Sequence, residues 1–211
     1  MGILEEINDA VIYGKRKDVV AGVEKALIEG YDAGVILHQS MIPAMTEVGL
    51  RFERNEFFVP EMLIAARAMQ AGIDILRPLL VEGGVEPLGT VAVGTVQGDL
   101  HDIGKNLVAL MLEGAGFEVR DLGVNVSPDH YVAAAQEGVQ IIGLSALLTT
   151  TMPAMKAVID ALEAAGVRGQ VKVMVGGAPV TQTYADEIGA DGYSPDASSA
   201  TRLAKQLLNI E

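Results

Sequence analysis

The residues with the clearest chemical potential lie in VGTVQGDLHDIGKNLVALMLEGAGFEV, residues 93–119, where an apolar segment gives way to an amphipathic helix. His101, one of only three histidines, stands in this turn between Asp99 and Asp102. An imidazole beside a carboxylate can move protons or ligate a metal, because the carboxylate fixes its tautomer. A structural interpretation is also open: Asp99 or Asp102 caps the helix that begins near Ile103, and His101 is an exposed turn residue.

Three common chemistries do not fit this turn. A phosphate-binding loop needs glycine where Asp99 stands and serine or threonine where Asn106 stands. A dinucleotide fingerprint needs G-x-G-x-x-G after a strand, which the sequence does not contain. A zinc or iron site needs several ligands at coherent spacing, whereas His38 and His130 fall in other predicted helices.

The first part of the chain has the apolar periodicity of helices. Segments such as DVVAGVEKALIEG and EMLIAARAMQAGIDILRPLL repeat apolar residues at helical intervals. We predict four helices, over 3–13, 17–29, 33–50 and 60–81, followed by the Gly- and Pro-rich linker VEGGVEPLGT. The expected first domain is a helical module over residues 1–84.

The second part alternates between short β-branched runs and longer helical patterns. The runs are TVAVGTV, EVRDLGV, IIGLSAL and KVMVGG, with a short fifth strand near 190–194 and a final helix over 197–209. Such alternation predicts βαβ units around a parallel sheet covered on both faces. The expected second domain, residues 85–211, is therefore an α/β domain with a flavodoxin-like (Rossmann-like), doubly wound, five-stranded parallel sheet.

The polar and glycine-rich segments follow the predicted strands. They are Gly98–Gly104 after the first strand, Ser145–Thr151 after the third, Gly176–Ala178 after the fourth and Tyr193–Ala197 after the fifth. In a 2-1-3-4-5 strand order these loops lie side by side at the carboxyl edge, where open α/β sheets bind ligands. We therefore expect one binding rim.

Composition narrows the function classes. The 211 residues carry a formal net charge of −13, and the sequence pI near 4.6 disfavours nucleic acid and anionic membranes as partners. The absence of cysteine excludes disulfides, thiolate metal sites and iron–sulfur clusters held by this chain. Neither a signal peptide nor an apolar run of about 20 residues is present, so a cytoplasmic location is expected.

The spacing of three motifs resembles that of corrinoid (vitamin B12) binding domains. These motifs are Asp99-x-His101-x-x-Gly104, Ser145-x-Leu147 about forty residues later, and Gly176-Gly177 about thirty residues beyond. The helical module resembles the cap of methyl-carrying corrinoid proteins and of methionine synthase. Together the motifs and the module cover nearly the whole chain. The chain looks like the corrinoid protein of anaerobic three-component methyltransferase systems, which use methylamines, methanol or methoxylated aromatics.

The resemblance assigns roles around the histidine turn. It implies that His101 ligates cobalt from below in place of the cofactor's own nucleotide base, and that Asp99 accepts the second N–H of the imidazole. The family's relay ends at a hydroxyl six residues after the SxL serine, which is Thr151 in this chain. Helix capping before Pro153 is the other interpretation of Thr151. The remaining cofactor-binding residues implied for this turn are Gly98, Leu100, Asp102 and Gly104.

The resemblance also implies a slot for the displaced nucleotide tail. Gly176, Gly177 and Ala178 leave room for the tail, Ser145 and Thr149 offer hydroxyls, Leu147 completes the SxL motif, and Ala197 in GYSPDASSA contributes a wall. The glycine pair is equally consistent with a tight turn between strand and helix. In RNEFFVPEMLIAARAM the resemblance places Phe58 over the corrin ring, although the stripe of Phe57, Met62 and Met69 has the spacing of a core.

The function implied is methyl transfer by a non-autonomous carrier component of a corrinoid-dependent methyltransferase system. Co(I) accepts a methyl group from a substrate:corrinoid methyltransferase, and methyl–Co(III) passes it to a corrinoid:acceptor methyltransferase that serves tetrahydrofolate or a thiol. A reductive activator of inactive Co(II) is a further implied partner. The cobalt supplies the difficult chemistry, and the protein supplies ligation and orientation.

Two other functions share parts of this pattern. The B12-binding subunit of an adenosylcobalamin mutase has D-x-H-x-x-G but is expected to lack the helical cap. A corrinoid-based sensor has both modules and normally adds a DNA-binding domain and, in the photoreceptors, a tryptophan in the cap. This chain has no tryptophan. The sequence leaves the methyl donor, the acceptor, the lower base of the corrinoid and the oligomeric state open.

Overall fold

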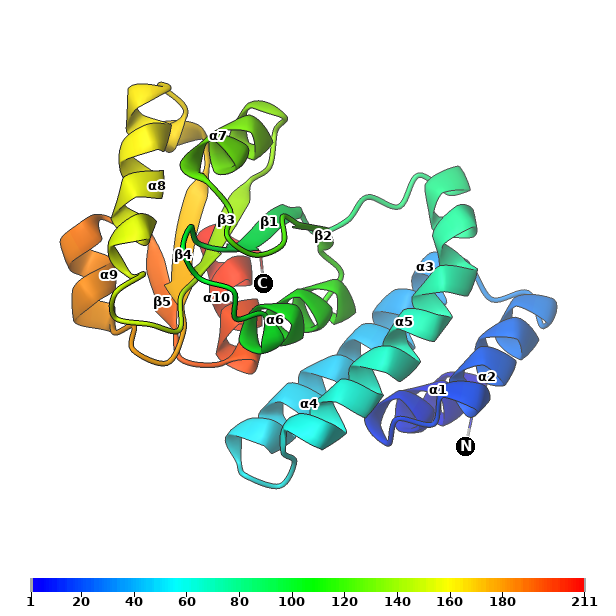
Figure 1. The fold of residues 1–211 in the computed structure, drawn as a ribbon. Helices are drawn as coiled ribbons and strands as arrows, with labels where there is room; N and C mark the ends of the chain where they lie inside the picture. Colours follow the sequence, from blue (N-terminus) through cyan, green and yellow to red (C-terminus); the bar gives the residue numbers. More distant parts are fainter. Residues whose placement is uncertain (1, 211) are drawn as a thin grey trace. The chain divides into compact units, whose positions relative to one another are not determined.

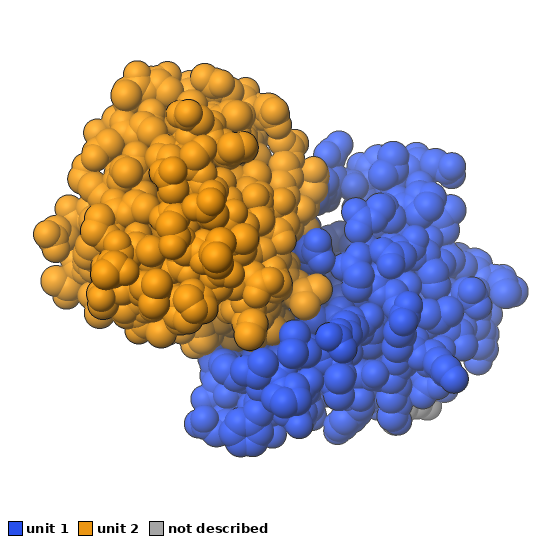
Figure 2. Space-filling view, in the orientation of Figure 1, with its two compact units in different colours: residues 1–87, 113–116 blue, residues 88–112, 117–211 orange. Residues whose placement is uncertain are grey.

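The computed structural model describes residues 2–210, which form two compact units (Figure 2). One unit contains the residues up to 87 together with 113–116, and the other contains 88–112 and the residues from 117 onward. No helix within the described residues is long and apolar enough to cross a membrane.

The first unit is helical throughout (Figure 1). Its elements are α1 (Ile3–Ile12), α2 (Arg16–Ile28), α3 (Ala33–Ile36), the π-helical η1 (Leu37–Met41), α4 (Ile42–Glu53) and α5 (Val59–Glu82). They correspond to the four helices expected from the sequence, with α3, η1 and α4 following one another without a break where one helix over 33–50 was expected.

The π turn in that third helix has a local cause. Pro43 has no N–H to donate, and its ring would clash with the carbonyl four residues earlier in a regular α-helix. The chain widens here, so that the N–H of Ile42 reaches the carbonyl of Leu37. The buried Ser40 ties the turn to α1, because its hydroxyl donates to the Leu4 carbonyl at 2.7 Å. A proline that periodicity alone overlooks thus divides the predicted helix.

The core of the first unit is rich in methionine. Met41, Met45, Met62 and Met69 are almost entirely buried, together with Ile7, Val19, Ile36 and Leu76. Gly72 of α5 permits close packing, since a Cβ there would overlap with the end of the Met41 side chain. Met62 and Met69 are therefore core residues, as their helical spacing suggested.

The second unit is the predicted doubly wound sheet. Its strands are β1 (Thr90–Thr95), β2 (Glu118–Asp121), β3 (Ile141–Ser145), β4 (Lys172–Gly176) and β5 (Gly192–Ser194). All neighbours are parallel, and their order is β2-β1-β3-β4-β5. The expected fold class and strand order are confirmed.

Helices cover both faces of this sheet (Figure 1). They are α6 (Ile103–Gly114), α7 (Pro128–Gln136), α8 (Pro153–Ala164), the short 3₁₀ turn η2 (Arg168–Gln170), α9 (Gln182–Ile188) and α10 (Ala197–Leu207). Alternate strand residues such as Ile142 and Val173 pack in one core with Met155 and Ile159 of α8. The rigid sheet thereby brings the loops after β1, β3, β4 and β5 to one edge.

Candidate functional site

The histidine turn joins β1 to α6 and is fixed by its own backbone. Gly98 has φ +86°, a left-handed conformation that glycine adopts without strain. Beyond it the N–H of Asp99 donates to the Val96 carbonyl at 3.1 Å, and the buried Thr95 hydroxyl donates to the His101 carbonyl at 2.8 Å. The end of β1 therefore holds His101 by its main chain.

The side chains of Asp99 and His101 form a close pair. His101 Nδ1 lies 2.7 Å from Asp99 Oδ1, and the backbone N–H of His101 donates to the same oxygen at 3.1 Å. The carboxylate is fully buried, while about half of the imidazole, 51%, is exposed. Because a carboxylate only accepts hydrogen bonds, Nδ1 carries the proton in the neutral imidazole, and the lone pair of that tautomer is on Nε2.

The second oxygen of Asp99 is held by the loop after β3. Asp99 Oδ2 accepts hydrogen bonds from Thr151 Oγ1 at 2.7 Å and from the Leu147 N–H at 2.8 Å. Burial raises the pKa of Asp99, but hydrogen bonds from Thr151, Leu147 and His101 outweigh it and hold that pKa well below its usual range. Asp99 is therefore a carboxylate at neutral pH.

The side chains of Asp99, Asp102 and Thr151 do not cap a helix, which was the alternative interpretation of these residues. Thr151 precedes Met152, the N-cap residue of α8, and its hydroxyl contacts Asp99 and the Leu148 carbonyl. At α6 the Asp102 carboxylate accepts from the Asn106 side chain at 3.2 Å. The structure thus brings Asp99, His101 and Thr151 into one hydrogen-bonded chain.

Large apolar side chains are exposed around this pair. Leu100 and Ile103, on either side of His101 in the sequence, are 71% and 77% exposed. Leu147 and Leu148, whose backbone N–H groups point at Asp99, are also exposed. Apolar side chains gathered around an accessible imidazole indicate a surface that binds a large, partly apolar group.

The ends of the central strands align the other predicted residues. Thr95 pairs with Ser145, Ser145 with Gly176, and Gly176 with Ser194, so these four positions form one row across the sheet. The side chains along this row are small or absent, so little side-chain volume projects from the strand ends. Gly177 has φ +128°, and a Cβ there would overlap with the Ala146 carbonyl, so this turn requires glycine. Both interpretations of the glycine pair therefore remain compatible with the structure.

The remaining predicted residues are less constrained. Thr149 is exposed in the loop before α8, Gly104 has open space where a Cβ would be, and Ala197 is buried at the first position of α10. Phe58 lies in the first unit as the N-cap residue of α5 and is 60% exposed.

The other histidines lie outside this arrangement. His38 belongs to η1 of the first unit, and His130 Nδ1 lies 2.8 Å from the Ser127 hydroxyl at the start of α7. Among residues 2–210, no three His, Cys, Asp or Glu side chains are grouped to hold a metal ion. A metal bound at His101 therefore needs a further source of ligands.

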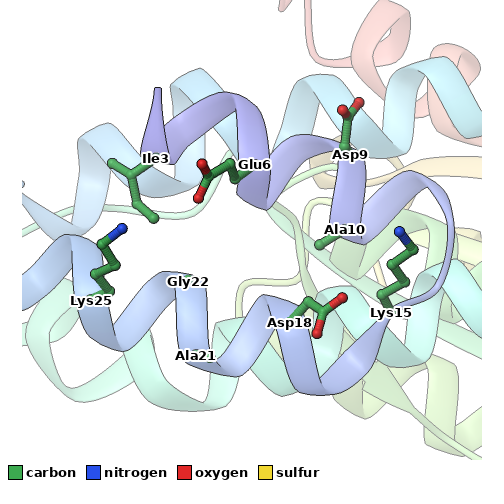
Figure 3. A pocket seen from close by; sticks show the side chains of 9 residues that line it. All are labelled: Ile3, Glu6, Asp9, Ala10, Lys15, Asp18, Ala21, Gly22 and Lys25. Atoms are coloured by element: carbon green, nitrogen blue, oxygen red, sulfur yellow. The ribbon is translucent and has the colours of Figure 1, made fainter. Parts of the chain in front are cut away.

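A shallow pocket between α1 and α2 contains none of the predicted site residues (Figure 3). Its walls mix acidic and basic side chains with small apolar ones, namely Ile3, Glu6, Asp9, Ala10, Lys15, Asp18, Ala21, Gly22 and Lys25. This mixture favours no particular ligand.

Sequence reasoning missed three polar residues that support the turn. Thr95 holds the His101 carbonyl, Asn125 binds the Gly98–Asp99 segment, and Lys105 binds Asp121. Asn125 stands in LGVNVSP, where an asparagine before a helix reads as an ordinary turn residue.

Two family matches decide what this arrangement is. Residues 89–202 match the family described as B12 binding domain, and residues 3–77 match a second family with the same description. The chain belongs to the B12-binding corrinoid proteins. A corrinoid is therefore its cofactor, and the corrin ring supplies the ligands that the protein does not.

Similar proteins match over nearly the whole length of the chain. Dimethylamine corrinoid protein 1 of Methanosarcina acetivorans is 47% identical over 208 residues, which are 98% of this chain and 97% of that protein. The dimethylamine corrinoid protein of Methanosarcina barkeri has the same identity and coverage. A corrinoid protein of Desulfitobacterium hafniense is 41% identical over 213 residues, 99% of this chain and 98% of that protein.

Solved structures share the fold. A cobalamin-binding protein from Desulfitobacterium hafniense has a TM-score of 0.81 at 33% identity, covering 97% of this chain and 98% of the other. The methanol:cobalamin methyltransferase complex of Methanosarcina barkeri has a TM-score of 0.87 at 30% identity, covering 98% and 80%. The monomethylamine corrinoid protein of Methanosarcina barkeri has a TM-score of 0.54 at 33% identity, covering 97% and 98%.

The described residues fit a corrinoid. His101 Nε2 would be the atom that holds the metal of such a cofactor, and the exposed leucine and isoleucine side chains near His101 would contact its apolar ring. The row of residues at the strand ends, which includes Ser145 and Gly176, has the small side chains that would leave room for the nucleotide tail of a corrinoid. None of these features opposes the cofactor with an unpaired buried charge.

Proposed function

We propose that the protein carries a methyl group on its corrinoid between two methyltransferases. A substrate:corrinoid methyltransferase delivers the methyl group, and a corrinoid:acceptor methyltransferase removes it. When bound, the corrinoid supplies a cobalt atom that takes up the methyl group in its Co(I) state and later releases it to tetrahydrofolate or a thiol. A reductive activator that rescues Co(II) completes the proposed set of partners.

The single observation that carries this proposal is the Asp99–His101 pair. A fully buried carboxylate holds Nδ1 of a half-exposed imidazole at 2.7 Å, which leaves Nε2 as the ring nitrogen that can bind a ligand. Imidazole ligands are commonly oriented by such a carboxylate, which raises their basicity. We assign His101 as the axial cobalt ligand and Asp99 as the residue that orients it.

The residues around the pair have supporting roles in this proposal. Thr151 fixes the second oxygen of Asp99, and the turn residues Gly98, Leu100, Asp102 and Gly104 place the imidazole and the apolar contacts beside it. The nucleotide tail is assigned to the residues at and after the strand ends: Ser145, Leu147, Thr149, Gly176, Gly177 and Ala197.

The first unit is assigned to shielding the methyl group. We place the helical cap module at residues 1–84 and the corrinoid-binding α/β domain at 85–211. Phe58 is the proposed cap residue, because its side chain is largely exposed at the start of α5 and is free to cover an apolar group. Its main chain is fixed, since the Phe58 N–H donates to Glu61 Oε2 at 2.9 Å.

A methylamine is the proposed source of the methyl group. Relatives at 47% identity over nearly the whole chain are named dimethylamine corrinoid proteins, so dimethylamine is the donor to test before monomethylamine and methanol. The same matches extend through the helical first unit, which a mutase subunit was expected to lack. Methyl transfer is therefore the function we propose.

The test of the proposal is cobalt ligation followed by methyl transfer. The protein is reconstituted with hydroxocobalamin and reduced to Co(II), where electron paramagnetic resonance is expected to show coupling to one histidine nitrogen. His101→Ala should remove that coupling, whereas the matched variants His38→Ala and His130→Ala should retain it. Coupling that survives His101→Ala would make the ligand assignment wrong.

The second part of the test uses the reduced protein with a dimethylamine:corrinoid methyltransferase. Methylation of the corrinoid, followed by its loss to an acceptor when the second methyltransferase is added, is the expected result. Rearrangement activity that depends on adenosylcobalamin, without methyl transfer, would contradict it.

A further inference from the structure

Asn125 occupies an unusual position in the loop between β2 and α7. Its φ of +53° lies in the left-handed region, which asparagine tolerates better than most residues. The residue is exposed, so no packing in the core requires it. Its conformation therefore points to a local task.

That task is visible in two hydrogen bonds to the histidine turn. Asn125 Oδ1 accepts from the Gly98 N–H at 2.8 Å, and the Asn125 N–H donates to the Asp99 carbonyl at 2.9 Å. One residue thus binds both ends of the Gly98–Asp99 segment, with its side chain at one end and its main chain at the other. The left-handed backbone allows both groups to face the turn.

Asp99 is consequently held from two sides by two different loops. The loop after β3 binds its carboxylate through Leu147 and Thr151, and the loop after β2 binds its main chain through Asn125. The carboxylate can orient His101 only if its own Cα is fixed, because a rotation of the main chain would move Oδ1 away from Nδ1. Asn125 supplies that main-chain restraint.

An ion pair between a buried lysine and a half-exposed aspartate fastens the Asn125 loop itself. Lys105 Nζ, on α6, lies 2.6 Å from both carboxylate oxygens of Asp121, and its side chain is only 3% exposed. The same carboxylate accepts from the Gly123 N–H at 2.8 Å. The loop after β2 is therefore anchored to α6, the helix that follows the histidine turn. It contacts Lys105 on the far side of the turn through Asp121, and Gly98 on the near side through Asn125.

We propose that Asn125 is a positioning residue for the cobalt ligand: it fixes Gly98 and Asp99 so that Asp99 presents His101 Nε2 in one direction. This proposal rests on the role of His101 as the axial ligand. Removal of the Asn125 side chain should leave the fold intact and let the imidazole adopt several orientations, which weakens cobalt ligation without abolishing corrinoid binding.

The decisive variant is Asn125→Gly, which keeps the left-handed backbone and the N–H to Asp99 but removes the acceptor for Gly98. Asn125→Asp restores an acceptor oxygen and should rescue the wild-type behaviour. Asn209→Gly is the matched control, since Asn209 has φ +56° at the end of α10. Thermal unfolding of all three should stay close to wild type.

The first measurement uses the protein without corrinoid. Hydrogen exchange at the Gly98 amide should be about fivefold faster in Asn125→Gly, as expected for the loss of one exposed hydrogen bond. The ¹⁵N signals of the His101 ring should shift toward the average of the two neutral tautomers. Asn125→Asp and Asn209→Gly should match wild type in both measurements.

The second measurement uses the reconstituted Co(II) protein. The fraction of corrinoid that shows histidine nitrogen coupling should fall in Asn125→Gly and return in Asn125→Asp. Unchanged ring signals and an unchanged coupled fraction in Asn125→Gly, or an equal loss in Asn209→Gly, would overturn the proposal. Failure of the ligand assignment itself is seen separately, as coupling that persists in His101→Ala.

Discussion

The histidine turn of the second unit and the α4–α5 loop of the first unit each present one side chain to which we assign a function, but they hold it differently. His101 is oriented by a fully buried carboxylate that accepts hydrogen bonds from its own turn and from the loop after β3. Phe58 follows a loop held by surface contacts, in which the Arg51 guanidinium lies over the rings of Tyr13 and Phe57 at 5.6 and 5.2 Å.

The difference follows from what each side chain has to do. The proposed role of His101 as cobalt ligand requires one direction for Nε2, and a buried polar network provides it because every misplaced donor would be costly. The proposed role of Phe58 as cap requires only apolar surface in roughly the right place. Surface cation–π contacts and the Arg51–Glu47 pair, at 2.7 Å, are sufficient for that and cost little to rearrange.

Loss of the Asp99 carboxylate should have the largest effect. Asp99→Asn replaces one acceptor oxygen by a donor, which then faces Thr151 and Leu147 or else His101. The free energy of unfolding of the corrinoid-free protein should fall by about 1–3 kcal/mol, the cost of unpaired buried donors. Chemical denaturation measures it, and a variant as stable as wild type would remove the contrast between the two regions.

Acid should reduce the difference in stability between wild type and Asp99→Asn. The pKa of Asp99 is lower in the folded protein than in the unfolded chain, so its carboxylate stabilises the fold above the usual aspartate pKa of about 3.9. As pH falls below about 4, this contribution is progressively lost. The stability gap between wild type and Asp99→Asn, measured by denaturation from pH 7 to pH 2, should narrow, and a gap that widens in acid would contradict the network.

A glycine in each region sharpens the comparison. Gly177→Ala places a Cβ against the fixed Ala146 carbonyl at φ +128°, and should destabilise the protein by about 1–3 kcal/mol. Gly30→Ala, at φ +88° in the first unit, places its Cβ where no other atom lies within 4 Å. Thermal unfolding should show a clearly smaller loss for Gly30→Ala, and equal losses would mean that the close contact with the Ala146 carbonyl adds nothing to the cost.

The smallest effect is expected at Arg51. Arg51→Ala removes the contacts with Tyr13 and Phe57, which are worth about 0.5–1 kcal/mol at exposed sites. Histidine coupling to Co(II) should be unchanged, while the rate of methyl–cobalt photolysis should change, because the loop that leads to the proposed cap residue Phe58 is less firmly held. Arg51→Lys is the milder control, and a loss of histidine coupling in Arg51→Ala would break the separation of roles.

The sequence alone carried much of the fold because periodicity is a local property. The helical spacing around Met62 and Met69 and the β-branched run that ends at Val96 are visible in short windows, and the strand order follows from the rules for βαβ units. The π turn before Pro43 was missed, since one proline does not interrupt the apolar pattern.

The site divides in the same way. Asp99, His101 and Thr151 were found through motif spacing, and the structure joins them by hydrogen bonds. Asn125 and Lys105 were not found, because their partners lie 27 and 16 residues away and the contact depends on how loops meet at the sheet edge. Polar contacts between loops leave no periodic trace in a sequence.

The Asp99 carboxylate also limits how this protein can evolve. Its two oxygens accept hydrogen bonds from the backbone N–H groups of His101 and Leu147 and from the Thr151 hydroxyl. No single second mutation can therefore compensate for its loss. Glutamate, longer by one methylene, would displace every partner at once. The contacts of Arg51 with aromatic rings vary gradually in strength, so tyrosine and phenylalanine can replace each other at positions 13 and 57 at small cost in free energy. Diversification toward new methyltransferase partners is therefore expected to begin in the α4–α5 loop, while position 99 stays closed to change.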